Sequence, residues 1–195
     1  MLSLSNAELI NNLTLLADFV GRVDSTSTTG VTVNSLADEN VVANDTLCVL
    51  SGINKNTDIA ITDFDNGLIE FDAIDSACGI RDIVAICKLG FDNYVANAYD
   101  ILKNDLKNKS VDIALFLNEW QLKQLHIYKT LELICGDRRN SSDSADAYNA
   151  NFERYQNLYN VELNGFVADY DISEDGAISE DEELNFKGQV GFIRW

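Results

Sequence analysis

The amino-acid sequence predicts a mainly α-helical fold, a multi-helix bundle with a long irregular or short β excursion after the first helix and an acidic loop near the C-terminus. Two observations favour this class. Apolar residues recur at the 3.6-residue spacing of a helix over most of the chain, and capping or turn residues stand where these stripes begin and end. With 195 residues, 46% of them hydrophobic, the chain can bury a core, and we expect residues 1–195 to form a single domain.

The first predicted helix spans roughly residues 6–20. Ser5 and Glu8 have the S-x-x-E spacing of a capping box, and apolar residues at helical spacing follow them. From residue 21 to about 62 the pattern gives way to Ser, Thr, Asn, Asp and Val, so we expect a long loop or a small hairpin over 21–62. Such a stretch is unusual inside a compact domain, and contacts from a neighbouring subunit would explain it.

Four further helices are predicted in the rest of the chain. Apolar stripes at helical spacing, bounded by Gly, Asn or Ser, predict helices over 67–89, 92–106, 111–135 and 145–168. Residues 66–168 thus form the predicted helical core. Residues 169–195 contain the acidic loop and a tail that alternates as a short terminal strand would.

Residues 171–182 read D-I-S-E-D-G-A-I-S-E-D-E, with the residue types and spacing of a calcium-binding loop. A twelve-residue loop of the EF-hand type offers oxygen ligands from positions 1, 3, 5, 7, 9 and 12, with glycine at position 6 for the sharp turn. Gly176 stands at position 6. The segment therefore resembles an EF-hand loop, with calcium as the predicted cofactor. The candidate metal ligands are Asp171, Ser173, Asp175, Ala177 through its carbonyl, Ser179 through a water, and bidentate Glu182.

An acidic, solvated turn is the alternative for this segment, because Asp, Ser and Gly are also the commonest loop residues. The resemblance covers little more than the loop, and no second loop in the sequence pairs with it. With three carboxylates among the ligands, we expect weak affinity, on the order of 10⁻⁵ to 10⁻³ M, as in structural sites.

The charge, the cysteine spacing and the lack of long apolar runs argue against several classes of function. The chain has 32 acidic and 14 basic residues, and its formal net charge of −18 argues against a surface that grips the phosphates of nucleic acid. The four cysteines lack C-x-x-C spacing, so we expect reduced core residues instead of a zinc site. The first 20 residues lack a signal-peptide pattern and no long apolar run occurs, so we expect a soluble chain that binds no membrane.

The sequence contains no recognisable arrangement of catalytic residues. His126, the single histidine, has no partner at a spacing that makes a catalytic pair, and we expect an exposed or boundary residue. Asp63, Asp65 and Gly67 faintly echo a second calcium loop, but without glutamate at its twelfth place, so we interpret them as a helix-capping turn. The aromatic series Tyr148, Phe152, Tyr155 and Tyr159 is predicted to be core. We therefore expect a protein that is not an enzyme.

The run DIALFLNEWQLKQLHIYKTLELICGDRR is followed by a polar gap and then by AYNANFERYQNLYNVEL, in which Arg154, Tyr155 and Tyr159 form an R-Y-x-x-x-Y pattern. Through these segments residues 66–165 resemble the helical head-tail connector (adaptor) proteins of tailed bacteriophages. The resemblance implies a virion protein, assembled in the host cytoplasm, that forms a homo-oligomeric ring. This ring would join portal and tail proteins and let DNA pass without specific binding. The calcium loop and the 21–62 excursion are not general features of that family.

A net charge of −18 suits such a conduit, because an acidic channel repels DNA phosphates, although acidity alone also confers solubility. We expect residues 21–62 and the C-terminal tail to supply the contacts of the ring. Two other classes stay open. A stand-alone EF-hand-like calcium-binding protein would be indicated by a monomer that changes shape with calcium, and an enzyme could assemble its site from distant positions.

Overall fold

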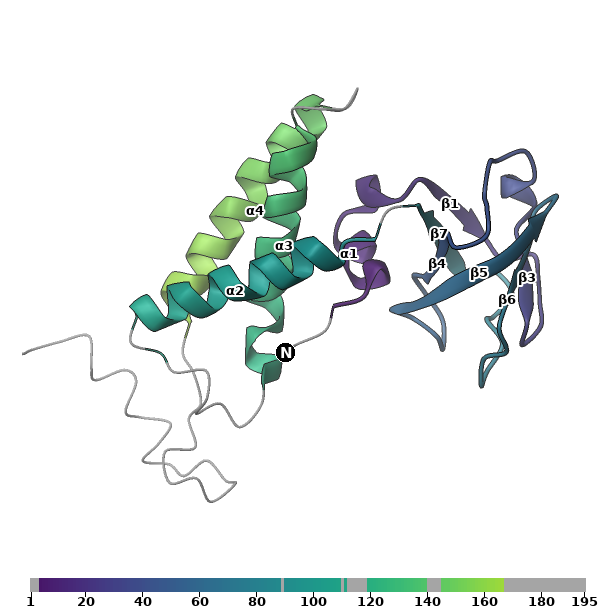
Figure 1. Cartoon of the computed structure of the whole chain (residues 1–195), viewed down its shortest axis with the longest axis horizontal. Coiled ribbons are helices and arrows are strands. Elements are labelled where there is room, and N and C mark those ends of the chain that lie inside the picture. Colours follow the sequence, from purple (N-terminus) through teal and green to yellow (C-terminus); the bar gives the residue numbers. More distant parts are fainter. Residues whose placement is uncertain (1–3, 89, 110, 112–118, 140–144, 167–195) are drawn as a thin grey trace, which may run out of the picture. The chain divides into compact units, whose positions relative to one another are not determined.

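The structure is a computed structural model of the whole chain, and it describes residues 4–88, 90–109, 111, 119–139 and 145–166. The chain divides into two compact units, one over Leu4–Phe91 and the other beginning at Asp92. Strands dominate the first unit and long helices dominate the second (Figure 1).

The first unit consists of seven strands, one short α-helix and two 3-10 helices. In chain order these are α1 (Asn6–Asn12), η1 (Thr14–Leu16), β1 (Phe19–Arg22), β2 (Ser25–Thr26), β3 (Gly30–Thr32), η2 (Asn34–Leu36), β4 (Thr46–Val49), β5 (Thr57–Asp65), β6 (Leu68–Phe71) and β7 (Ile83–Cys87). The strand order is β1-β7-β4-β5-β6-β3-β2. Every neighbouring pair in it is antiparallel.

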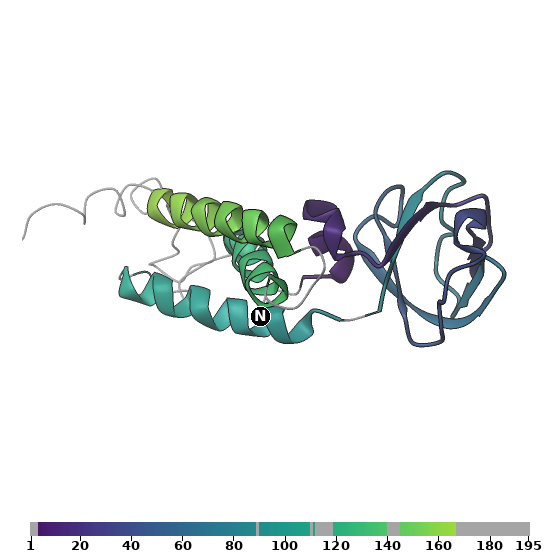
Figure 2. The ribbon, with the colours of Figure 1, turned by 90° about the horizontal axis from the view of Figure 1, so that it is seen from above.

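The sheet closes on itself because β1 and β2 are two parts of one bent segment. β1 pairs with β7 at one end of the strand order, and β2 pairs with β3 at the other. Between them, the Val23 N–H donates to the Asp82 carbonyl at 2.9 Å, and the Asp24 N–H donates to the Thr32 carbonyl at 2.8 Å. The unit is therefore a small closed barrel, whose strands curve around a common centre in Figure 2. Closure pairs backbone groups that an open sheet edge would expose.

Strand β5 belongs to both halves of the barrel. Its first part pairs with β4 and its second part pairs with β6, and the register shifts between Ile61 and Asp63. Such a bulge bends a strand, which lets one strand turn the corner of a barrel. The inward side chains form one core: Val23, Val31, Val33, Leu36, Val41, Leu47, Val49, Ile59, Ile61, Ile69, Phe71, Cys78, Val84 and Ile86.

Helix α1 begins at the predicted capping box. The Glu8 N–H donates to the Ser5 hydroxyl, and the Glu8 carboxylate accepts from the Ser5 N–H. The carboxylate of Asp58, on β5, also accepts from the N–H groups of Asn6 at 2.6 Å and Ala7 at 2.8 Å. A carboxylate at the first turn satisfies free N–H groups and complements the helix dipole, so it fixes α1 against the start of β5.

The second unit contains α2 (Asp92–Asn108), η4 (Glu119–Leu122), α3 (Lys123–Arg138) and α4 (Ala145–Gly165). Helix α3 packs against both α2 and α4. Its central position explains why its buried residues lie on several sides of the helix, from Leu125 to Cys135. None of the helices in the described ranges is long and apolar enough to cross a membrane.

The predicted mainly α-helical, all-alpha class is wrong, because the chain combines helices with a seven-stranded antiparallel sheet. The first helix ends at Asn12 instead of residue 20, and the region 67–89 forms β6 and β7 instead of a helix. The 21–62 excursion contains most of the barrel strands. The helices predicted over 92–106 and 145–168 are confirmed as α2 and α4, and α3 confirms the later part of 111–135.

The error over 67–89 has a physical cause. Ile83–Cys87 is a continuous apolar run of five residues, and periodicity cannot assign such a run to a buried strand or a buried helix. Asn66 and Gly67 carry the stronger signal. Both have positive φ, 46° and 84°, as a type I′ hairpin turn requires. They join β5 to β6, so the turn interpreted as a helix cap is a β-hairpin turn.

Candidate assembly surface

The predicted calcium ligands lie outside the described residues. Asp171, Ser173, Asp175, Ala177, Ser179 and Glu182 all belong to the segment 167–195, whose structure is not described. Over the described part of the chain, no group of three or more His, Cys, Asp or Glu side chains is arranged to hold a metal ion. Calcium binding by residues 171–182 therefore stays a prediction of the sequence.

His126 is fully buried, which corrects the expectation of an exposed or boundary residue. Its Nε2 lies 2.7 Å from the Val95 carbonyl oxygen, and its ring centroid lies 5.4 Å from that of Tyr99. The histidine thus links α3 to α2 from within the core. This is a packing role, in which one ring nitrogen, Nε2, is satisfied by a backbone carbonyl.

All four cysteines are free and buried, as predicted. Burial raises the pKa of the Cys135 thiol from 9.0 to about 11, although the nearby Arg138 opposes this shift. A raised pKa keeps the thiol protonated, and the protonated thiol is a poor nucleophile. Burial likewise raises the pKa of Cys48 and of Cys78.

Polar side chains in the helical unit hold the helices to one another. The Tyr159 hydroxyl, on α4, donates to Asp105 of α2 at 2.7 Å, and burial together with this bond raises the Tyr159 pKa. The ammonium of Lys129, on α3, lies 4.4 Å from the centre of the Tyr159 ring and 2.9 Å from the Glu132 carboxylate. Buried polar groups that are mutually satisfied specify how helices pack. Tyr148, Tyr155 and Tyr159 are buried, which confirms their predicted core role, whereas Phe152, from the same series, is only half-buried.

The barrel unit presents apolar side chains to solvent on two turns that lie against each other. Ile53, between β4 and β5, is 78% exposed, and Ile80, before β7, is 67% exposed. The turns are joined because the Asn54 side chain donates to the Ser76 carbonyl at 2.7 Å and Gly52 packs against the carboxylate of Asp82. The two isoleucines therefore place exposed apolar surface on adjoining turns of the barrel.

Basic side chains stand beside these isoleucines. Arg22 is paired with Ile83 on β1 and β7, Arg81 directly follows Ile80, and Lys55 lies in the same turn as Ile53. All three are exposed, and none has a carboxylate partner among the described residues. The neighbouring carboxylates of Asp24 and Asp82 accept hydrogen bonds from the backbone N–H groups of Asn34 and Gly79. We call the five residues Arg22, Ile53, Lys55, Ile80 and Arg81 the cationic loop end.

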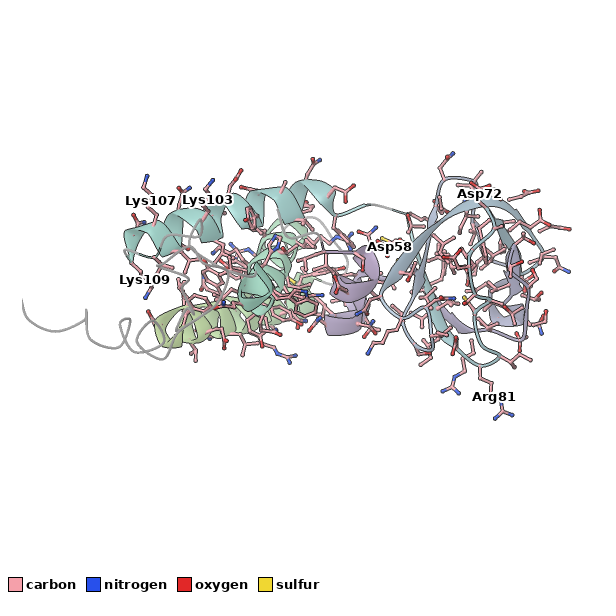
Figure 3. All side chains as sticks on the ribbon, turned by 90° about the horizontal axis from the view of Figure 1, so that it is seen from below. Asp58, Asp72, Arg81, Lys103, Lys107 and Lys109 are labelled. Carbon is pink, nitrogen blue, oxygen red and sulfur yellow. The ribbon has the colours of Figure 1, made fainter. Side chains whose placement is uncertain are left out.

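Arg81 also has a strained backbone. Its φ of 73° lies in the left-handed region, where a side chain other than that of Gly, Asn or Asp costs about 1–2 kcal/mol. The Arg81 N–H donates to the Val23 carbonyl at 2.7 Å, which ties the turn to the bent segment that closes the barrel. Strain that is held in place by such bonds is frequent at functional positions. In Figure 3 the Arg81 side chain points away from the barrel.

The remainder of the barrel surface is acidic. Residues 4–91 contain four Lys or Arg against 13 Asp or Glu. On the β5–β6 hairpin, Asp63 and Glu70 are direct cross-strand partners, and Asp65 follows at the turn. Like charges directly opposite on a sheet are destabilising. We call Asp63, Asp65 and Glu70 the acidic hairpin, and Figure 3 shows that Asp72, just beyond it, points away from the barrel on the side opposite to Arg81.

Sequence reasoning missed the cationic loop end because it treated 21–62 as an excursion and 67–89 as a helix. One signal was present. In S-G-I-N-K-N and C-G-I-R-D, an isoleucine directly follows a glycine inside a polar turn. An apolar residue at a turn tip has no core to enter, so these two residues predict exposed apolar side chains. Neither models of known protein families nor curated proteins match this chain.

Proposed function

We propose that the chain is a structural, non-enzymatic subunit that assembles with copies of itself into a ring, as a head-tail connector of a tailed bacteriophage particle does. The observation that carries this proposal is the cationic loop end. Ile53 and Ile80 are exposed on turns that are hydrogen-bonded and, at Arg81, strained. A surface built in this way is suited to burial against a partner.

The helical unit supports the proposal in a second way. The described parts of the segments that resemble connector proteins fall on η4, α3 and α4, and in that pattern Tyr155 and Tyr159 are buried while Arg154 is exposed. The resemblance is now limited to residues from Asp92 onward, because residues 66–91 belong to the barrel unit. In a ring, a net charge of −18 would keep passing DNA from adhering to the channel wall.

A structural calcium site over residues 171–182 belongs to this proposal. The alternative is a stand-alone EF-hand-like calcium-binding protein, which the same loop favours. Both alternatives use the calcium loop, but only the first requires that copies associate.

Native mass spectrometry of the full chain, with calcium and with a chelator, separates these functions. We expect an oligomer of one size whose mass is a whole multiple of the 21.6 kDa chain. A monomer at every concentration, with a collision cross-section that changes on calcium removal, would favour the stand-alone protein. A monomer unaffected by calcium would contradict both functions.

A further inference from the structure

We infer that the contact between copies joins the cationic loop end of one barrel to the acidic hairpin of the next. This inference rests on the proposed function and names the two surfaces through which copies would meet. The occupant is a second copy of this chain because each barrel carries both members of a complementary pair. One member is the exposed isoleucines with cations that form no ion pair within the described residues, and the other is a hairpin whose Asp63 and Glu70 carboxylates form no ion pair there.

The two surfaces are made of different residues of one barrel. β5 begins at Thr57, next to the turn that bears Ile53 and Lys55, and ends at Asp65, in the acidic hairpin. Nine residues of strand span at most roughly 30 Å along β5, which bends at its bulge. A contact between two different surfaces is heterologous, so each copy can bind one neighbour through each surface, and repetition of the contact yields a ring or an open filament.

The charges explain why this contact would be favoured in a chain that otherwise repels itself. With a net charge of −18, most approaches between two copies bring carboxylates together. Arg22 and Arg81 form no ion pair within the described residues, and Asp63 stands directly opposite Glu70 without a cation between them. A neighbouring copy would supply each set with its missing counter-charge. The exposed Ile53 and Ile80 would add apolar burial at the centre of the contact.

Two charge-reversed variants of the full chain test this pairing by sedimentation velocity. The first variant, Arg22→Glu with Arg81→Glu, makes the loop end negative. The second, Asp63→Lys with Glu70→Lys, makes the hairpin positive. Each variant alone has two surfaces of like charge, and we expect it to associate at least about tenfold more weakly than the wild type. In an equimolar mixture, each contact between a copy of one variant and a copy of the other is complementary, so we expect association to return.

Two controls separate this contact from net charge and from misfolding. Lys103→Glu with Lys107→Glu makes the same charge change on the exposed face of α2 (Figure 3), and we expect it to associate as the wild type does. Arg81→Asn removes a charge and also relieves the backbone strain, since asparagine tolerates a positive φ. We expect Arg81→Asn to melt no lower than the wild type and to associate more weakly.

The outcomes distinguish this inference from the function on which it rests. A wild-type chain that stays monomeric overturns the ring and this contact together. A wild-type oligomer whose association either charge-reversed variant leaves unchanged overturns the contact alone, as does a mixture that fails to recover. Loss of association when salt rises from about 0.1 to 1 M, where the Debye length falls from about 10 to 3 Å, would support it. Salt-independent association would overturn it.

Discussion

The barrel can be tested at Gly21, the one glycine of β1, which pairs with Val84 of β7. Gly21 is buried, and a Cβ at this position would overlap Cγ1 of Val33 and come within 2.9 Å of the Ser35 hydroxyl. No substitution with a side chain fits unless its neighbour gives way. Gly21→Ala should therefore destabilise the barrel by about 1–3 kcal/mol, the usual cost of an extra methyl group in a packed core.

The same contact predicts a compensating substitution. Val33→Ala alone removes two methyl groups from a fully buried side chain, which should cost about 2 kcal/mol by the transfer free energy of each group and the cavity left behind. In the double variant, the new methyl group at Gly21 enters the space that Val33 vacates. Its cost should fall below the sum of the single costs by about 1 kcal/mol or more.

Hydrogen exchange is the suitable assay, because it reports the opening free energy of amides in β4 and β7 separately from the helical unit. Gly165→Ala is the matched control, because a Cβ there meets no atom within 4 Å. That control should be neutral or stabilising by up to about 1 kcal/mol, since alanine favours helix more than glycine does. Costs that add within about 0.5 kcal/mol in the double variant would refute the packing of β1 against Val33.

Three further predictions concern the helical unit and the metal. Tyr159→Phe removes the hydroxyl that donates to Asp105 at 2.7 Å and should cost about 1–3 kcal/mol in urea unfolding. Tyr128→Phe should cost little, because the Tyr128 hydroxyl makes no such bond to the described part of the chain. Burial raises the Cys135 pKa from 9.0 to about 11, so the folded state keeps this thiol protonated at a pH where the unfolded state loses the proton. The contribution of Cys135 to the free energy of unfolding is therefore complete below pH 9 and is lost as the pH rises toward 11. Cys135→Ala should lack this part of the pH dependence. Glu182→Gln should abolish most of the heat of calcium binding in a calorimetric titration. For the wild-type chain, a calcium concentration of about a hundred times the dissociation constant should raise the free energy of unfolding by roughly 2.7 kcal/mol. Equal losses of stability in Tyr159→Phe and Tyr128→Phe would contradict the first prediction. The same dependence of stability on pH in Cys135→Ala and in the wild type would contradict the second. A wild-type titration without heat of calcium binding would contradict the third.

The sequence predicted the helical unit well because its helices carry a one-sided signal. Val95, Ala98, Leu102 and Leu106 recur every three or four residues along α2, and all four are buried. At the N-terminus, the predicted first helix was too long. Helix α1 starts at the predicted capping box but stops at Asn12, and the apolar residues counted in its later turns belong to η1 and β1.

The barrel was missed for reasons of length and composition. Its strands are mostly two to five residues long, which is too short for a period of two to be distinguished from a period of 3.6. Closure depends on bonds between distant segments, such as Val23 with Asp82, that no local pattern encodes. The Asn-Gly turn at residues 66 and 67 was the readable signal, since this dipeptide between alternating residues is typical of a type I′ hairpin.

The candidate surface divides in the same way. The sequence alone shows that an isoleucine follows a glycine in each of two polar turns. The barrel brings these two turns together and places Arg22 of β1 near them, and the sequence alone did not predict this. Carboxylates were counted from composition, but the direct opposition of Asp63 and Glu70 required the strand register with its bulge.

Electron microscopy of the purified full chain in calcium tests the central claim most directly. The account predicts closed rings of uniform size, with a central channel wide enough for duplex DNA, that are absent from preparations of the Arg22→Glu with Arg81→Glu variant. Monomers, or open filaments without a channel, in the wild-type preparation would contradict the proposed function.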